Sequence, residues 1–82
     1  MPLEAISAIL RTLRTARQLT VPESAARIGV HKSTVYAWEA AAKLPEPAQL
    51  RRAVVVYDAD QTVRARLAWL RGYGVEPMEH AA

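Results

Sequence analysis

Residues 20–39 read TVPESAARIGVHKSTVYAWE and contain two short amphipathic segments on either side of a glycine. The first segment opens with TVPE (residues 20–23), which has the S/T-x-x-E form of a capping box, and proline is tolerated in a first helical turn. Gly29 can adopt the positive φ that ends a helix, and Val35 and Trp38 give the second segment an apolar side. Two short helices with a glycine at the corner between them predict a helix-turn-helix motif.

The helix breakers around this motif divide the remaining chain into three more helical segments. The apolar residues are mostly alanine, leucine and valine, and no stretch shows the sustained alternation of a half-buried strand. We therefore expect an all-α fold, a compact bundle of five helices with short connections. The expected helices cover residues 3–17, 20–29, 32–42, 47–57 and 60–71, with Asp58 or Asp60 as the N-cap of the last. The domain is expected over residues 1–74, with the motif at 20–40 and a flexible tail at 75–82.

The positive charge of the chain is unevenly placed. The net charge of +3 comes from residues 1–45, which carry six basic and three acidic side chains, whereas residues 46–82 carry five of each. An excess of this size is weak support for a polyanionic partner, because ordinary soluble proteins have a similar charge.

Several functional classes are not expected from this composition. The chain has no cysteine, and its two histidines, His31 and His80, lie far apart, so we expect no metal site and no cofactor. The three glycines are isolated and the serines have no base near them, so no enzyme is expected. No apolar run reaches the ~18 residues of a membrane span, and residues 1–10 lack the basic start of a signal peptide. We expect a cytoplasmic protein without a membrane segment.

Together with LRTLRTARQLT before it and WEAAAKLP after it, the motif resembles the phage-repressor-like family, also called Cro-like or xenobiotic-response-element helix-turn-helix proteins. The resemblance covers Ile6 to Tyr57. It rests on Leu-Arg pairs in the first helix, Leu19-Thr20, Ala25, Gly29-Val30, Val35, Trp38-Glu39 and Pro45. It implies a lambda-repressor-like fold and a sequence-specific transcriptional repressor of phage, plasmid or bacterial origin. In such proteins the helix at 32–42 would enter the major groove of double-stranded DNA.

Two positions depart from the family pattern. Ser24 stands where the family usually has leucine, and we expect weaker core packing there. Ala41 stands where glycine often follows the Trp-Glu pair, so we expect the third helix to continue further than usual.

The resemblance also implies DNA contacts at single positions. Base contacts are implied for Lys32, Ser33, Tyr36 and Ala37, since lysine suits guanine O6 and N7 and alanine can pack on a thymine methyl group. Phosphate contacts are implied for Thr20, Arg27, His31, Thr34 and Lys43. The alternative is that the charged side chains lie on an ordinary solvated face and that His31 and Thr34 cap their helix locally.

A structural ion pair and a homodimer interface are expected as well. Arg14 and Glu39 match a family pair that bridges the first helix and the recognition helix; otherwise they are two independent surface charges. A second stripe on the helix at 60–71 predicts a homodimer interface formed by Ala65, Trp69 and Tyr73. The alternative is that the two aromatic side chains cover the C-terminal region of their own domain.

Two other functions stay open. The segment STVYAWEAAAKLPEP also resembles the excisionase family of architectural DNA-binding proteins, which would require a β-wing after the motif, and residues 54–57 could form such a strand. The third candidate is a protein–protein adaptor that reuses the fold without binding DNA, which the low net charge favours. A steep loss of affinity with rising salt would separate the two DNA-binding functions from the adaptor.

Overall fold

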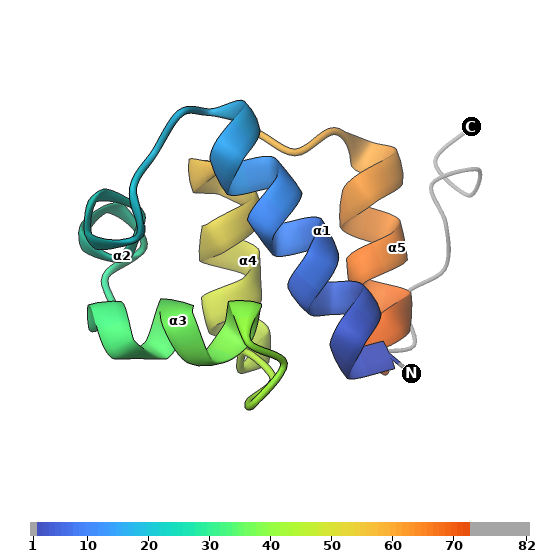
Figure 1. Ribbon diagram of the computed structural model, residues 1–82. Coiled ribbons are helices and arrows are strands. Elements are labelled where there is room, and N and C mark those ends of the chain that lie inside the picture. The colour runs from blue at the N-terminus through green and yellow to red at the C-terminus, as the bar shows by residue number, and fades with distance from the viewer. Residues whose placement is uncertain (1, 73–82) are drawn as a thin grey trace.

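In the computed structural model, which describes residues 2–72, the chain folds into five α-helices (Figure 1). They are α1 (Pro2–Ala16), α2 (Val21–Ile28), α3 (Lys32–Glu39), α4 (Pro47–Val56) and α5 (Gln61–Arg71). No strand occurs between residues 2 and 72, so the predicted all-α class is confirmed. The tail predicted at 75–82 and the predicted interface residue Tyr73 lie outside the described residues.

The helix-turn-helix motif occupies one end of the molecule. Figure 1 shows α2 and α3 at that end, α5 at the other, and α1 crossing in front of α4 between them. Helix α1 packs against both α3 and α5, whereas α2 packs against both α3 and α4. Two sets of contacts, one through α1 and one through α4, therefore fix the orientation of the motif on the bundle.

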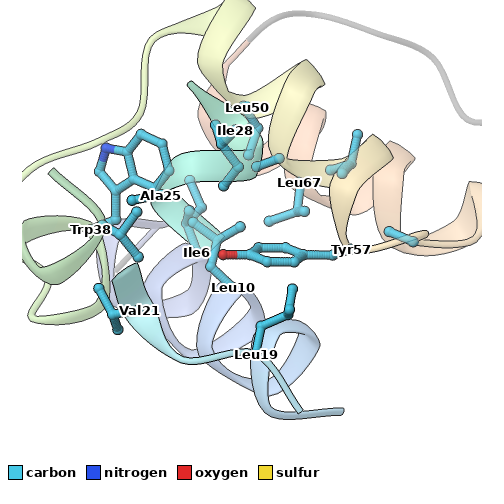
Figure 2. Packing of buried hydrophobic residues seen from close by; sticks show 14 residues of the cluster. Ile6, Leu10, Leu19, Val21, Ala25, Ile28, Trp38, Leu50, Tyr57 and Leu67 are labelled. Carbon is cyan, nitrogen blue, oxygen red and sulfur yellow. The ribbon is translucent and has the colours of Figure 1, made fainter. Parts of the chain in front are cut away.

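All five helices bury apolar side chains in one core, because each has an apolar stripe at helical spacing. The large side chains that are almost completely buried include Ile6, Leu10, Ile28, Val35, Trp38, Tyr57 and Leu67 (Figure 2). The first and last helices of the chain thus both face this core.

Helix α2 begins and ends at the positions that its capping residues predicted. Thr20 and Glu23 make both bonds of a capping box: the Glu23 amide donates to Thr20 Oγ1 at 3.2 Å, and the Thr20 amide donates to Glu23 Oε1 at 2.8 Å. These bonds lower the pKa of Glu23, because they stabilise its carboxylate. At the other end Gly29 has φ 89°, the left-handed conformation that glycine adopts without strain.

The segment that follows the motif is helical and contains no wing. Of the two candidate caps for α5, Asp60 is the one used: its Oδ1 accepts from the Val63 amide at 2.9 Å. Helix α4 continues through Val56, and Tyr57 is its C-cap. The alternative strand at residues 54–57 is therefore wrong, and the excisionase comparison loses the β-wing that it requires.

The predicted end of the third helix is also wrong. Helix α3 stops at Glu39, and Ala41 has φ 58°, the left-handed conformation of a residue just beyond a helix. The Ala42 amide donates to the Ala37 carbonyl at 2.9 Å and the Ala41 amide to the Trp38 carbonyl at 3.2 Å, the two bonds of a Schellman motif. Ala42 lies beyond the helix and is exposed. The turn that glycine usually makes is thus made by alanine.

We expect Ala41→Gly to raise the free energy of unfolding by up to about 1 kcal/mol, because a left-handed L-residue is strained by roughly that amount. In a domain of this size the melting temperature would rise by roughly 4–8 °C per kcal/mol. Thermal unfolding followed by circular dichroism measures the effect. Ala40→Gly is the matched control: Ala40 has φ −87°, so glycine there adds only chain entropy and should destabilise. A lower melting temperature for Ala41→Gly would contradict the assigned strain.

Candidate nucleic-acid interface

The N-terminal turn of α3 is capped by a side chain that also fixes its neighbour. His31 Nδ1 accepts a hydrogen bond from the Ser33 amide at 3.1 Å and lies 2.8 Å from Ser33 Oγ. Since an amide only donates, Nδ1 is the acceptor in this cap. The Ser33 hydroxyl consequently donates to Nδ1, which leaves its oxygen lone pairs as acceptors toward solvent.

The predicted base contacts lie on the outer side of α3. Lys32, Ser33 and Tyr36 are exposed, with 55% of Tyr36 accessible, whereas Ala37 is half-buried. Val35, Trp38 and Glu39 occupy the opposite, buried side. The structure therefore brings three polar side chains together on the exposed first turns of this helix.

The predicted phosphate contacts divide into two groups. Four of them lie at the motif and its flanking turns: Thr20 before α2, His31 and Thr34 at the start of α3, and Lys43 in the loop after α3. The side-chain oxygen of Thr20 is already engaged in the capping box. Arg27 lies apart from this group, on the side of α2 that borders α4.

Arg14 and Glu39 form a two-pronged ion pair between α1 and α3. Arg14 Nε donates to Glu39 Oε2 at 2.7 Å, and Arg14 Nη2 donates to Glu39 Oε1 at 2.9 Å. The side chains are 15% and 6% exposed, so the pair is shielded from solvent. The hydrogen bonds to Glu39 raise the pKa of the Arg14 guanidinium, although its partial burial acts in the opposite direction.

A second arginine, which was not predicted from the sequence, lies at the same carboxylate. Arg11 Nη2 donates to the Glu39 carbonyl at 3.1 Å, and its Nε lies 3.6 Å from Glu39 Oε1. Arg11 precedes Arg14 by three residues, so the two lie on one face of α1, and this spacing could have predicted the contact. Both arginines hold the last residue of α3.

Ser24 is completely buried and its hydroxyl hydrogen-bonds with the Tyr57 hydroxyl, which links α2 to the end of α4. Burial raises the pKa of Tyr57, and the bond to Ser24 partly opposes that effect. We expected weaker core packing at Ser24, where the family usually has leucine, and this hydrogen bond compensates for the smaller side chain. Tyr57 lies at the centre of the core, with its oxygen directed inward (Figure 2).

Two of the three predicted dimer residues, Ala65 and Trp69, lie on α5, away from the motif. Trp69 is 68% exposed and Ala65 is half-buried. Within residues 2–72, the Trp69 ring thus remains largely uncovered by its own domain.

The family model of the helix-turn-helix domain matches residues 5–67, and the chain belongs to this family. No curated protein and no solved structure matches the chain significantly. Membership of the family indicates a DNA-binding regulator. In the described part of the chain no helix is long and apolar enough to cross a membrane, and no cluster of three potential metal ligands occurs.

Proposed function

We propose that the protein is a sequence-specific transcriptional regulator, a repressor that inserts α3 into the major groove of its operator. The observation that carries this proposal is the exposed polar turn of Lys32, Ser33 and Tyr36 on a helix whose far end is fixed by a buried ion pair. Base reading requires a donor and acceptor pattern held in one orientation, and these two features supply it.

The side chains of α3 suggest which base atoms they contact. Lys32 donates to guanine O6 and N7. Ser33, whose proton is engaged by His31, accepts from an exposed amino group, that is adenine N6 or cytosine N4. Tyr36 contacts a base edge one turn later, and Ala37 packs on a thymine methyl group.

Phosphate contacts would orient the domain on the duplex without reading sequence. We assign them to Thr20 at the start of α2 and to His31 Nε2, Thr34 and Lys43. These contacts make binding weaker as salt concentration rises.

Selection of binding sites from a random duplex library at physiological salt tests this proposal. We expect the wild-type chain to enrich a two-fold symmetric site, and Lys32→Ala to lose one specified base pair per half-site with an affinity loss of about tenfold to a hundredfold. Thr12→Ala is the control, because Thr12 is exposed on α1 and its hydroxyl bonds only to the Ala8 carbonyl of the same helix. If Lys32→Ala selects the same DNA site with the same affinity as the wild type, α3 is not the helix that reads the bases.

Enrichment of asymmetric or tandem sites by the wild type would favour an architectural DNA-binding role. No enrichment by the folded protein would favour the protein–protein adaptor.

We also propose that α5 forms the homodimer interface through Ala65, Trp69 and Tyr73, because a single motif buries too little surface for tight specific binding. Sedimentation equilibrium should show at least about a tenfold weaker dimer for Trp69→Ala, the loss expected for a central aromatic side chain. Tyr36→Ala, which removes an exposed aromatic side chain from α3, should leave the dimer intact. An unchanged dimer in Trp69→Ala would eliminate this interface.

A further inference from the structure

A second surface of the molecule combines apolar side chains with positive charge. A groove of about 500 Å³ runs between α2 and α4 and is lined by Arg27, Ala48, Arg51, Arg52, Val55 and Val56. Val55 is 66% exposed, which is unusual for a large apolar side chain without a partner. Three guanidinium groups thus surround an apolar floor, and no carboxylate lines it.

The arginines of the groove are available to a ligand. Arg27 and Arg51 make no hydrogen bond or ion pair within residues 2–72, although the Arg27 charge contributes to lowering the pKa of Glu23 one turn earlier on α2. Arg52 Nε donates to the Ile28 carbonyl at 2.9 Å, which holds this guanidinium across the groove. Helix α4 itself contains no acidic residue. The groove is therefore complementary to an acidic ligand.

The groove lies away from the base-reading side of α3. On α2, Ala25 lies beside Trp38 of α3 (Figure 2), and Arg27 is two residues further, about 200° around the helix axis. No residue of α3 lines the groove. A ligand bound there would leave the N-terminal turn of α3 accessible to DNA.

We propose that this groove docks an acidic, amphipathic helical segment of a partner protein. The eight positions from Ala48 to Val55 span about 10 Å of α4, so the groove accommodates roughly two turns of a partner helix. Apolar side chains of that segment would cover Val55 and Val56, and its carboxylates would pair with Arg27 and Arg51 at the rim. A DNA backbone would satisfy the arginines but would leave the apolar floor exposed, which is why a protein segment fits better.

Selection from a displayed random-peptide library against the immobilised full chain tests the proposal. We expect enriched peptides with acidic residues and apolar residues at i, i+3 or i+4 spacing. The enriched peptide is then synthesised, and its affinity is measured by fluorescence anisotropy. Arg51→Glu should weaken binding at least about tenfold, because it places like charges against the peptide.

Arg66→Glu is the matched control, since it makes the same charge reversal at an exposed position of α5. It should change peptide affinity less than about twofold, as expected for a charge distant from the contact. Both variants should retain the circular dichroism spectrum and melting temperature of the wild type. The proposal is overturned if no acidic peptides are enriched or if Arg51→Glu binds the peptide like Arg66→Glu. It is also overturned if Arg51→Glu weakens binding to duplex DNA as much as it weakens binding to the peptide, which would assign the groove to phosphates.

Discussion

Arg14→Ala is expected to lower the free energy of unfolding by about 3 kcal/mol, because it leaves the Glu39 carboxylate buried without its two-pronged partner. The Glu39 side chain is only 6% exposed, so water cannot replace the guanidinium. The Leu19 carbonyl also loses its bond from Arg14 Nη1, which is 2.8 Å long. In a domain whose total stability is about 4–12 kcal/mol, such a loss is a large fraction of the whole.

A double-mutant cycle of Arg14→Ala and Glu39→Gln, followed by urea unfolding, measures the interaction directly. The double variant should be less destabilised than the sum of the two single variants by about 1–3 kcal/mol, since removing both charges removes the unpaired one. Arg11→Ala is the matched control on the same helix and the same carboxylate: its side chain is 61% exposed and 3.6 Å away, so its loss should cost under about 1 kcal/mol. Equal losses for Arg11→Ala and Arg14→Ala would show that burial does not strengthen the pair.

Ser24→Ala is expected to destabilise the protein by about 1–3 kcal/mol, because it leaves the buried hydroxyl of Tyr57 without a partner. Tyr57→Phe leaves the buried Ser24 hydroxyl without its partner in the same way, so it should destabilise the protein by a similar amount. The combined variant removes both polar groups and should be more stable than additivity predicts. Urea unfolding of the three variants measures this, and strict additivity would contradict the hydrogen bond.

The burial of Tyr57 also makes stability depend on alkaline pH. The pKa of Tyr57 is raised above its ordinary value of 10.0, so the folded state holds the phenol proton more tightly than the unfolded state does. The stabilisation is complete below pH 10 and is lost as pH rises from there through the folded value. Tyr57→Phe should remove this part of the alkaline loss, and urea unfolding between pH 8 and 11 measures it.

The helix ends were the part of the fold that the sequence predicted best, because capping is local chemistry. Thr20 with Glu23 and the glycine at 29 needed no knowledge of the tertiary structure. Ala41 is the counterexample: its left-handed conformation is imposed by a Schellman turn that alanine does not favour, so helix propensity predicted continuation. The Ser24–Tyr57 bond joins residues that are 33 positions apart, and only the crossing of α2 and α4 brings them together.

The candidate site was predictable to a different degree at each position. Helical periodicity alone places Ser33 and Ala37 on the side of α3 opposite Val35 and Trp38, with Lys32 and Tyr36 between the two sides. The pairing of Arg14 with Glu39 came only from the family resemblance, because two charges 25 positions apart carry no local signal. The groove between α2 and α4 was not predicted, since its shape depends on how two helices cross.

Under the proposed function, the two arginines at Glu39 would also determine how accurately the protein reads DNA. They hold α3 at its last residue, whereas the proposed base contacts Lys32 and Ser33 lie at its first turn, about 10 Å away along the axis. Over that length a tilt of only about 5° displaces the reading end by roughly 1 Å, which is enough to lose a hydrogen bond. When the ion pair is weakened, α3 can tilt about its end at Glu39. Such a protein would still be attracted to phosphates but would distinguish poorly between DNA sequences. Sequence specificity would therefore be lost before affinity.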